Sequence, residues 1–128
     1  MVTPIMQGVS INVHTAYKGN YVQGEQANYL FSYYIDIENK TNYTIKLLRR
    51  HWYIFDSSGE YSEVEGEGVI GQQPVLFPGE VFEYESACNL NTDMGKMYGT
   101  YLFERTDDKF TFMVQIPEFE LISPYRLN

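Results

Sequence analysis

Three glycines near the middle of the chain have the spacing of a phosphate-binding loop. Gly66, Gly68 and Gly71 match the Gly-x-Gly-x-x-Gly pattern of dinucleotide-binding proteins. That chemistry needs a helix directly after the glycines, because the N-terminus of the helix holds the pyrophosphate. Here Gln72-Gln73-Pro74 follows, and no helical periodicity comes after it. The sequence therefore favours a tight connection, in which glycines allow positive φ angles, over a nucleotide site.

The same loop is a candidate for binding a protein partner, because loops at the ends of β-sheets commonly carry recognition. The candidate binding residues are Gly66, Glu67, Gly68, Val69, Ile70 and Gly71. We expect an acidic, tightly turned loop with Val69 and Ile70 near its exposed tip. Changing Glu67 and Val69 is then predicted to abolish binding while the fold survives.

Glutamates at alternate positions precede and enter this loop: Glu63, Glu65 and Glu67. In an extended segment they project on one side, where they could hold Mg²⁺ or Co²⁺ weakly through water. A high-affinity cobalt site would need imidazole or thiolate ligands, but His14, His51 and Cys88 lie far apart in the sequence. The sequence therefore favours a solvated edge strand whose charges discourage pairing with another strand.

The one basic cluster, Arg49, Arg50 and His51, lies beside Trp52. Neighbouring side chains on a strand point to opposite faces, so these three residues do not form a basic groove. The formal net charge of −8 repels phosphate backbones, and we predict no nucleic-acid binding. Trp52 is predicted to lie in the core, as a strand tryptophan does in immunoglobulin-like sandwiches.

Cys88 is the only cysteine and has no neighbouring base, so it is predicted to be an unreactive small side chain. With two histidines in the chain, no serine–histidine–aspartate order can be argued, and no catalytic residue is predicted. The apolar runs are too short to cross a bilayer, and the N-terminus shows no secretory signal. We expect a cytoplasmic protein that is not inserted in a membrane.

The elements that carry these residues are strands. Apolar and polar residues alternate or form short apolar runs over residues 9–17, 29–37, 43–55, 60–65, 72–77, 82–86, 97–103, 110–116 and 119–122. Turn signals separate them, among them a loop at Gly19–Gly24. We expect one all-β domain over residues 1–128, an antiparallel sandwich of seven or more strands.

Two details of this pattern predict irregular strands. The apolar positions change parity at Leu47-Leu48, which a β-bulge would explain, although partial cover of both faces would also serve. Gly99 within a strand indicates a bulge or a close approach of two backbones. Pro117 either ends its strand or places it at the edge of a sheet.

Five segments together resemble the bacterial ApaG proteins, in order and over nearly the whole chain. They are Leu47 to Trp52, Val64 to Pro74, Pro78-Gly79-Glu80 with Tyr84 and Ser86, Met97 to Tyr101, and Phe112 to Phe119. One departure is Arg49-Arg50-His51 in place of the commoner Gly-Arg-Tyr, which puts in doubt any role tied to a tyrosine at position 51.

The resemblance implies a fibronectin type III-like, immunoglobulin-like β-sandwich. It also implies a genetic association with cobalt resistance and magnesium efflux. Relatives occur as domains in a eukaryotic F-box protein and in a polymerase-interacting protein, which points to protein–protein contact.

We therefore expect a non-enzymatic protein-interaction module with no cofactor and a protein partner whose identity the sequence does not give. The alternative is a small-ligand binder that takes a phosphate, a nucleotide or a divalent cation at the Gly66–Gly71 loop. A weak Mg²⁺ or Co²⁺ contact and a homodimer both stay open.

Overall fold

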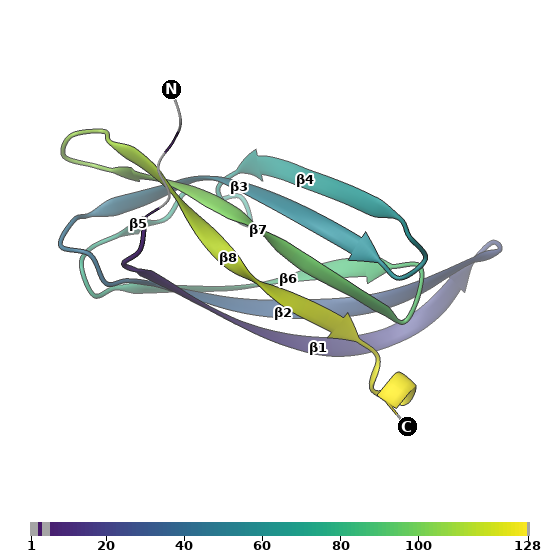
Figure 1. The fold of residues 1–128 in the computed structure, drawn as a ribbon. Coiled ribbons are helices and arrows are strands. Elements are labelled where there is room, and N and C mark those ends of the chain that lie inside the picture. The colour runs from purple at the N-terminus through teal and green to yellow at the C-terminus, as the bar shows by residue number, and fades with distance from the viewer. Residues whose placement is uncertain (1–2, 4–5, 128) are drawn as a thin grey trace.

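Strands make up most of the structure. The computed structural model describes residues 3 and 6–127 (Figure 1). Its elements are β1 (Val9–Gln23), β2 (Gln26–Asn39), β3 (Ile45–Asp56), β4 (Tyr61–Glu67), β5 (Val75–Leu76), β6 (Val81–Leu90), β7 (Met94–Arg105), β8 (Thr111–Ile122) and a short 3₁₀ helix, η1 (Pro124–Leu127).

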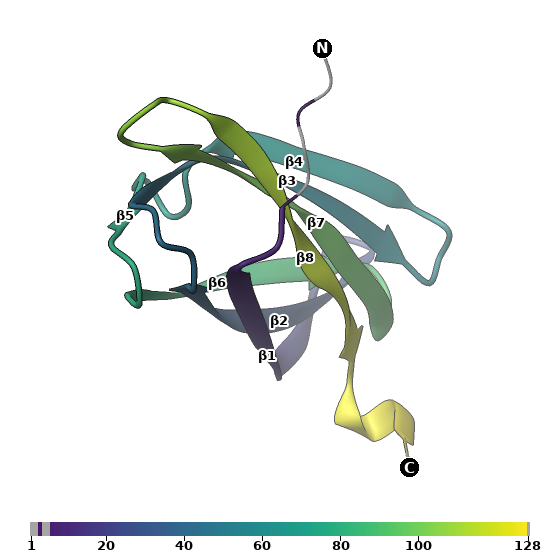
Figure 2. The same cartoon turned by 60° about the vertical axis from the view of Figure 1, so that its left-hand side comes forward.

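The strands form two antiparallel sheets that face each other (Figures 1 and 2). One sheet has the order β1-β2-β6, and the other has the order β4-β3-β7-β8, with β5 paired to β3. The 3₁₀ helix follows β8 and projects beyond the sandwich (Figure 2). The prediction of an immunoglobulin-like, fibronectin type III-like sandwich is confirmed.

The bulge expected in the third strand is present. The register of β3 against β7 shifts between Leu47 and Arg49, so Leu48 is the extra residue. As a result Leu47 and Trp52, which have opposite parity in the sequence, are both buried in the core. The β-bulge predicted from the change of parity at Leu47-Leu48 is therefore confirmed.

Two predicted boundaries were wrong. The loop expected at Gly19–Gly24 is strand as far as Gln23, because β1 pairs with β2 up to that residue, and only Gly24 lies in a turn. The chain absorbs Gly19 at a register shift after Tyr17, where glycine takes a φ of 122° without ending the ladder. Likewise residues 119–122 are not separate, since β8 runs through Pro117. Of the two alternatives stated for Pro117, the position in an edge strand is the one observed, since the strand does not end there.

Aromatic side chains fill the space between the sheets around Trp52, which is 2% exposed. The Trp52 ring makes edge-on contacts with Tyr33, Tyr101 and Phe119, at centroid distances of 5.5, 6.3 and 5.8 Å. Such pairs add about 0.5–1.5 kcal/mol each beyond the burial of apolar area. The prediction that Trp52 belongs to the core is confirmed.

A hydrogen bond between two tyrosine side chains crosses this core. The hydroxyl groups of Tyr84 on β6 and Tyr101 on β7 are 2.5 Å apart, and the two strands belong to different sheets. Burial raises the pKa of both phenols well above the ordinary value, so both stay protonated. The pair therefore supplies a polar link between two sheet faces whose contact is mainly apolar.

Asp56 holds two hairpin loops together at one end of the sandwich. Its carboxylate accepts hydrogen bonds from the backbone amides of Asn91 and Ser58 and from the Thr92 hydroxyl. Burial alone would raise the pKa of this carboxyl group, but these hydrogen bonds outweigh burial and lower it. Asp56 therefore stabilises the fold when it is ionised.

We expect Asp56→Asn to lower the free energy of unfolding at pH 7 by about 1–3 kcal/mol. A lowered folded-state pKa stabilises the protein above the ordinary value of 3.8, and this contribution is lost as pH falls through the folded-state value. The difference between variant and wild type should therefore shrink at pH 3. Urea denaturation at both pH values measures it, with Glu85→Gln on the exposed side of β6 as control. An unchanged difference at pH 3 would contradict the assignment.

Candidate functional site

The glycine-rich segment is a two-residue turn closed at the end of β4. The Val69 amide donates to the Gln72 carbonyl, the Gln72 amide donates to the Val69 carbonyl, and each N···O distance is 2.9 Å. Between them Ile70 and Gly71 have φ angles of 43° and 76°. Positive φ at both central residues is typical of a type I′ turn.

Gly66 and Gly68 each lie where a Cβ atom would clash with a different neighbour. A Cβ atom on Gly68, where φ is 57°, would lie 1.9 Å from the Gln72 carbonyl oxygen. A Cβ atom on Gly66 would lie 2.8 Å from the Arg50 guanidinium. That guanidinium donates to the carbonyls of Glu67 and Gly68, at 3.0 and 3.1 Å. Arg50 thus fastens the loop to β3 from the inner side of the strand.

The placement expected for Val69 was wrong. Its side chain is fully buried in the core, because it forms the first corner of the turn and points between the sheets. Exposed positions of the loop are Glu67, Ile70 and Gly71, and Ile70 is 51% exposed. A change at Val69 would therefore damage the fold, and it cannot serve as a test of binding.

The loop does not have the form of a phosphate cradle. No helix follows it, because β5 and an extended connection come next (Figure 1). The Gly68 amide donates to the Leu48 carbonyl at 2.8 Å, and the amides of Val69 and Gln72 close the turn. A phosphate site needs amides that point at the ligand, whereas these three donate to the protein itself.

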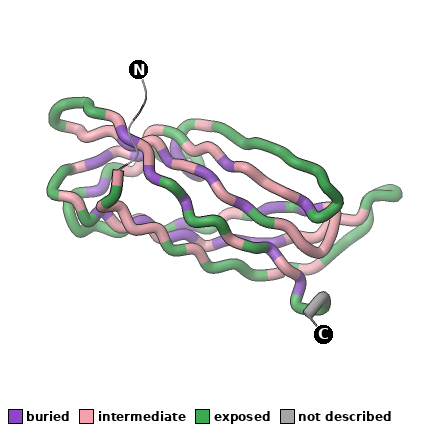
Figure 3. The backbone as a smooth tube through the Cα atoms, viewed as in Figure 1, coloured by how far each residue is buried: buried purple, intermediate pink, exposed green. Residues whose placement is uncertain are grey.

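The alternating glutamates lie on one side of β4, as predicted, and two of them meet His51. The Nε2 atom of His51 is 2.7 Å from Glu63, and its Nδ1 atom is 2.9 Å from Glu65. The imidazole of His51 therefore lies between two carboxylates, with one ring nitrogen directed at each. Figure 3 shows β4 exposed along most of its length, which fits an edge strand kept in water by charge.

Over residues 3 and 6–127, no group of three His, Cys, Asp or Glu side chains is placed to hold a metal ion. Both nitrogens of His51 are already directed at carboxylates. His14 lies on β1 against Tyr34, and Cys88 is buried on β6. Burial raises the pKa of the Cys88 thiol to about 11, which disfavours the thiolate.

The basic cluster divides between the two faces of its strand, as expected. Arg49 and His51 lie on the outer face, while Arg50 turns inward to the loop carbonyls. The three residues therefore present no continuous basic surface.

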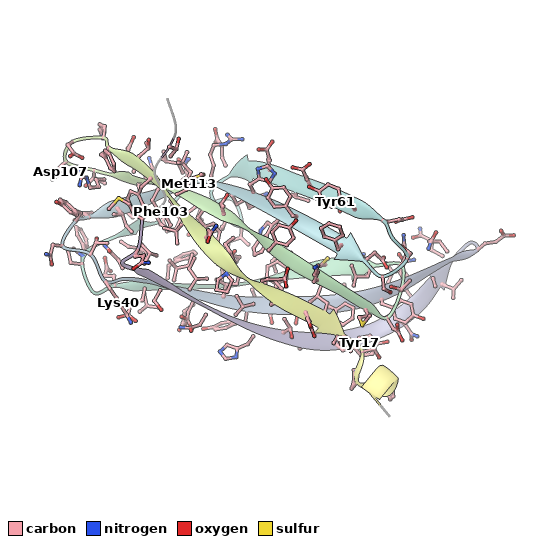
Figure 4. The ribbon with its side chains drawn as sticks, in the orientation of Figure 1. Tyr17, Lys40, Tyr61, Phe103, Asp107 and Met113 are labelled. Atoms are coloured by element: carbon pink, nitrogen blue, oxygen red, sulfur yellow. The ribbon has the colours of Figure 1, made fainter. Side chains whose placement is uncertain are left out.

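The outer face of the β4-β3-β7-β8 sheet carries an aromatic cluster that sequence reasoning missed. We call it the aromatic face, and its members are His51, Tyr53, Phe55, Tyr61 and Tyr98. The rings stack across strands: Tyr53 and Tyr98 have centroids 5.1 Å apart and planes 13° apart. His51 stacks on Tyr53 at 4.4 Å, and Phe55 contacts Tyr61 at 4.9 Å. Figure 4 labels Tyr61 at one end of this outer face and Met113 at the other.

One signal of this cluster was present in the sequence. Between Trp52 and Phe55 the strand is apolar at every position, so both of its faces are apolar. Tyr98 joins Tyr53 only through the pairing of β3 with β7. That pairing joins residues more than forty positions apart in the chain.

The chain is similar to known proteins over most of its length. A family model described as the ApaG domain matches residues 19–105. The chain belongs to the ApaG family. It is 41% identical to Protein ApaG of Allorhizobium ampelinum, over 97% of this chain and 95% of that protein. It is 44% identical to Protein ApaG of Methylobacillus flagellatus, over 93% of each.

Solved structures agree with the ApaG assignment. A Bordetella pertussis protein whose crystal structure was determined under the name ApaA is 38% identical, with a TM-score of 0.83. The similarity covers 97% of this chain and 98% of that one. Within the described part of this ApaG chain, no helix has the length and apolar character needed to cross a bilayer.

Proposed function

We propose that this ApaG-family chain is a non-enzymatic protein-interaction module that uses the Gly66–Gly71 loop. The observation that supports this most is the conformation of Ile70. A β-branched residue rarely adopts positive φ, yet Ile70 holds a φ of 43° and exposes half of its side chain. Strain of this kind, about 1–3 kcal/mol, concentrates at functional positions.

The rest of the loop suits recognition by its rigidity. Arg50 and the reciprocal Val69–Gln72 hydrogen bonds hold the turn, so little conformational freedom is lost when a partner binds. Glu67 and Ile70 are both exposed positions of this loop, which favours a partner that offers an apolar group and a basic one.

We expect Ile70→Asn to raise stability and to abolish partner binding. Asn-Gly is the preferred dipeptide of a type I′ turn, so relief of strain should raise the free energy of unfolding by roughly 1 kcal/mol. Affinity capture from the native cytoplasm, with quantitative mass spectrometry, compares wild type and variant; urea denaturation measures stability.

The matched control is Val22→Asn, which changes a 71% exposed apolar residue at the distant end of β1. It should leave the captured proteins unchanged. If Ile70→Asn retains every partner of the wild type, the loop is not the binding site.

We also propose that the protein is cytoplasmic and that its link to cation handling is indirect. A single buried cysteine suits the reducing cytoplasm, where we place the protein. The association of the ApaG family with cobalt resistance and magnesium efflux is then an indirect effect, exerted through a partner that handles the cation. The described residues that would hold a metal do not converge, which favours this indirect route.

Direct binding of a small ligand at the loop has less support, because the loop amides are used within the protein. We expect no change in the amide NMR shifts of residues 66–73 at millimolar phosphate, Mg²⁺ or Co²⁺. Saturable shifts confined to this loop would favour the small-ligand function instead.

A further inference from the structure

The sandwich is open along one of its sides. On the closed side the edge strands β1 and β8 pack against each other, whereas on the other side the edge strands β4 and β6 make few contacts. Val64 on β4 is 41% exposed, although its ladder partner Trp52 is 2% exposed. Paired residues of antiparallel strands point to the same face, so Val64 points between the sheets and is still reached by solvent.

A cavity of about 300 Å³ enters the sandwich at this opening. Trp52 and Val64 line it on the β3-β4 side. Tyr33 and Ser86, which are ladder partners in β2 and β6, line it on the other side. The volume lies at the lower end of the range for small-molecule sites. A molecule in this cavity would therefore meet aromatic and aliphatic groups on one wall and residues with hydroxyl groups on the other.

The cation of this cavity is Arg50, which lies on the inner side of β3 over its ladder partner Gly66. Both hydrogen bonds that the described residues form with this guanidinium leave from Nη1, toward the carbonyls of Glu67 and Gly68. Among residues 3 and 6–127, no acidic residue lines the cavity or forms an ion pair with Arg50. A guanidinium carries five N–H donors, so Nε and Nη2 can still donate to a ligand.

The charge of Arg50 acts on the interior of the sandwich. Burial raises the pKa of Tyr33, Tyr84 and Tyr101, and in each case the charge of Arg50 acts in the opposite direction. These phenols belong to both sheets, so the guanidinium is directed at the space between them. A cation beside an apolar interior is destabilising unless an anion pairs with it. An anionic ligand would supply that pair.

From the open side, the cavity behind it and the guanidinium that no carboxylate neutralises, we infer that this protein binds a small organic acid between its two sheets. The carboxylate of the ligand accepts two hydrogen bonds from Arg50, and its apolar body packs against Trp52 and Val64. The cavity reaches Met97 of β7, which is 1% exposed, so the ligand is a free small molecule held inside the sandwich. This inference goes beyond the proposed role of the loop and does not depend on it.

Titration with 3-phenylpropionate tests the inference, because this compound joins a carboxylate to an apolar ring. Binding is followed by the fluorescence of Trp52, the only tryptophan in the chain, and by amide NMR. Two matched compounds are titrated beside it. One is 3-phenylpropionamide, which has the same shape without the charge, and the other is acetate, which has the charge without the ring.

Two protein variants test the walls of the cavity. Arg50→Lys keeps the positive charge but loses the planar fork of donors. Ser86→Leu fills the cavity from the β6 side and leaves Arg50 in place. The matched control is Glu85→Leu, which adds the same side chain to the exposed, outward side of β6. Circular dichroism checks that each variant is folded.

The expected result is saturable binding of 3-phenylpropionate, with NMR shifts centred on Trp52, Ser86 and Cys88. The amide should bind about tenfold or more weakly, because it cannot form a charged pair with Arg50. Arg50→Lys should weaken binding of the acid about fivefold. Ser86→Leu should weaken it about tenfold or more, because the leucine occupies the site. Glu85→Leu should bind the acid as wild type does.

Four outcomes would overturn the inference. The first is the absence of any saturable change at millimolar 3-phenylpropionate. The second is an amide, or acetate, that binds as tightly as the acid. The third is NMR shifts centred on the Gly66–Gly71 loop or on the aromatic face. The fourth is a folded Ser86→Leu variant that binds as wild type does. The three titrations of the wild type decide the matter even if both variants fail to fold.

Discussion

Replacing Gly99 with alanine should lower the free energy of unfolding by about 3 kcal/mol or more. The new Cβ atom would lie 2.1 Å from the His51 carbonyl oxygen and 3.2 Å from the Cα atom of Trp52. Both contacts are with the β3 backbone, so no side-chain rotation can relieve them. β3 and β7 would have to move apart at the centre of their sheet, where they pair from Ile45 to Asp56.

Urea denaturation, followed by circular dichroism, measures this effect. Thr100→Ala is the matched control, because its half-buried side chain lies on the outer face, next to Gly99 in the same strand. A loss below about 1 kcal/mol for Gly99→Ala would contradict the close approach of the two strands, because overpacking a fixed backbone contact costs more.

The second large effect is expected for Gly68→Ala, which should destabilise the protein by about 3 kcal/mol. The Cβ atom would lie 1.9 Å from the Gln72 carbonyl oxygen, and the residue would keep an unfavourable positive φ. To make room, the turn would have to move away from β3. The hydrogen bond from the Gly68 amide to Leu48 and the Arg50 contacts would then be lost.

Gly71→Ala separates the cost of the positive φ from the cost of the steric contact with Gln72. Gly71 also has a positive φ, of 76°, but a Cβ atom there meets no other atom within 4 Å. Its loss should be about 1–2 kcal/mol, the cost of a left-handed conformation alone. Equal losses for the two variants, measured by urea denaturation, would show that the contact with Gln72 does not limit the loop.

The sequence predicted the sandwich well because alternation reports which side of each strand is buried. The parity change at Leu47-Leu48 even located the bulge in β3. Boundaries were less predictable at Gly19, since a glycine can end a strand or be absorbed in a bulge, and only pairing with β2 decides between them.

The candidate site was predictable only in part. The Gly-x-Gly-x-x-Gly pattern correctly indicated a tight turn, but the turn residues proved to be Ile70 and Gly71. Propensity could not have shown this, because isoleucine disfavours positive φ. Once Ile70 occupies the turn, Val69 is directed into the core instead of the solvent.

Contacts between residues on different strands could not be predicted from the local pattern of apolar and polar residues. His51 meets Glu63 and Glu65 because β3 and β4 form a hairpin in one particular register. A shift of one residue would direct His51 at the opposite side of β4. The aromatic face depends in the same way on the register of β7, which the sequence does not reveal.

The hydroxyl pair of Tyr84 and Tyr101 has a consequence for how the two sheets are aligned. Apolar packing is not directional, so two apolar sheet faces could slide past each other at a small cost in free energy. A hydrogen bond loses most of its strength when its partners shift or tilt. This pair therefore fixes the position of β6 relative to β7. Because both phenols keep their protons far above neutral pH, this hydrogen bond persists across the physiological pH range.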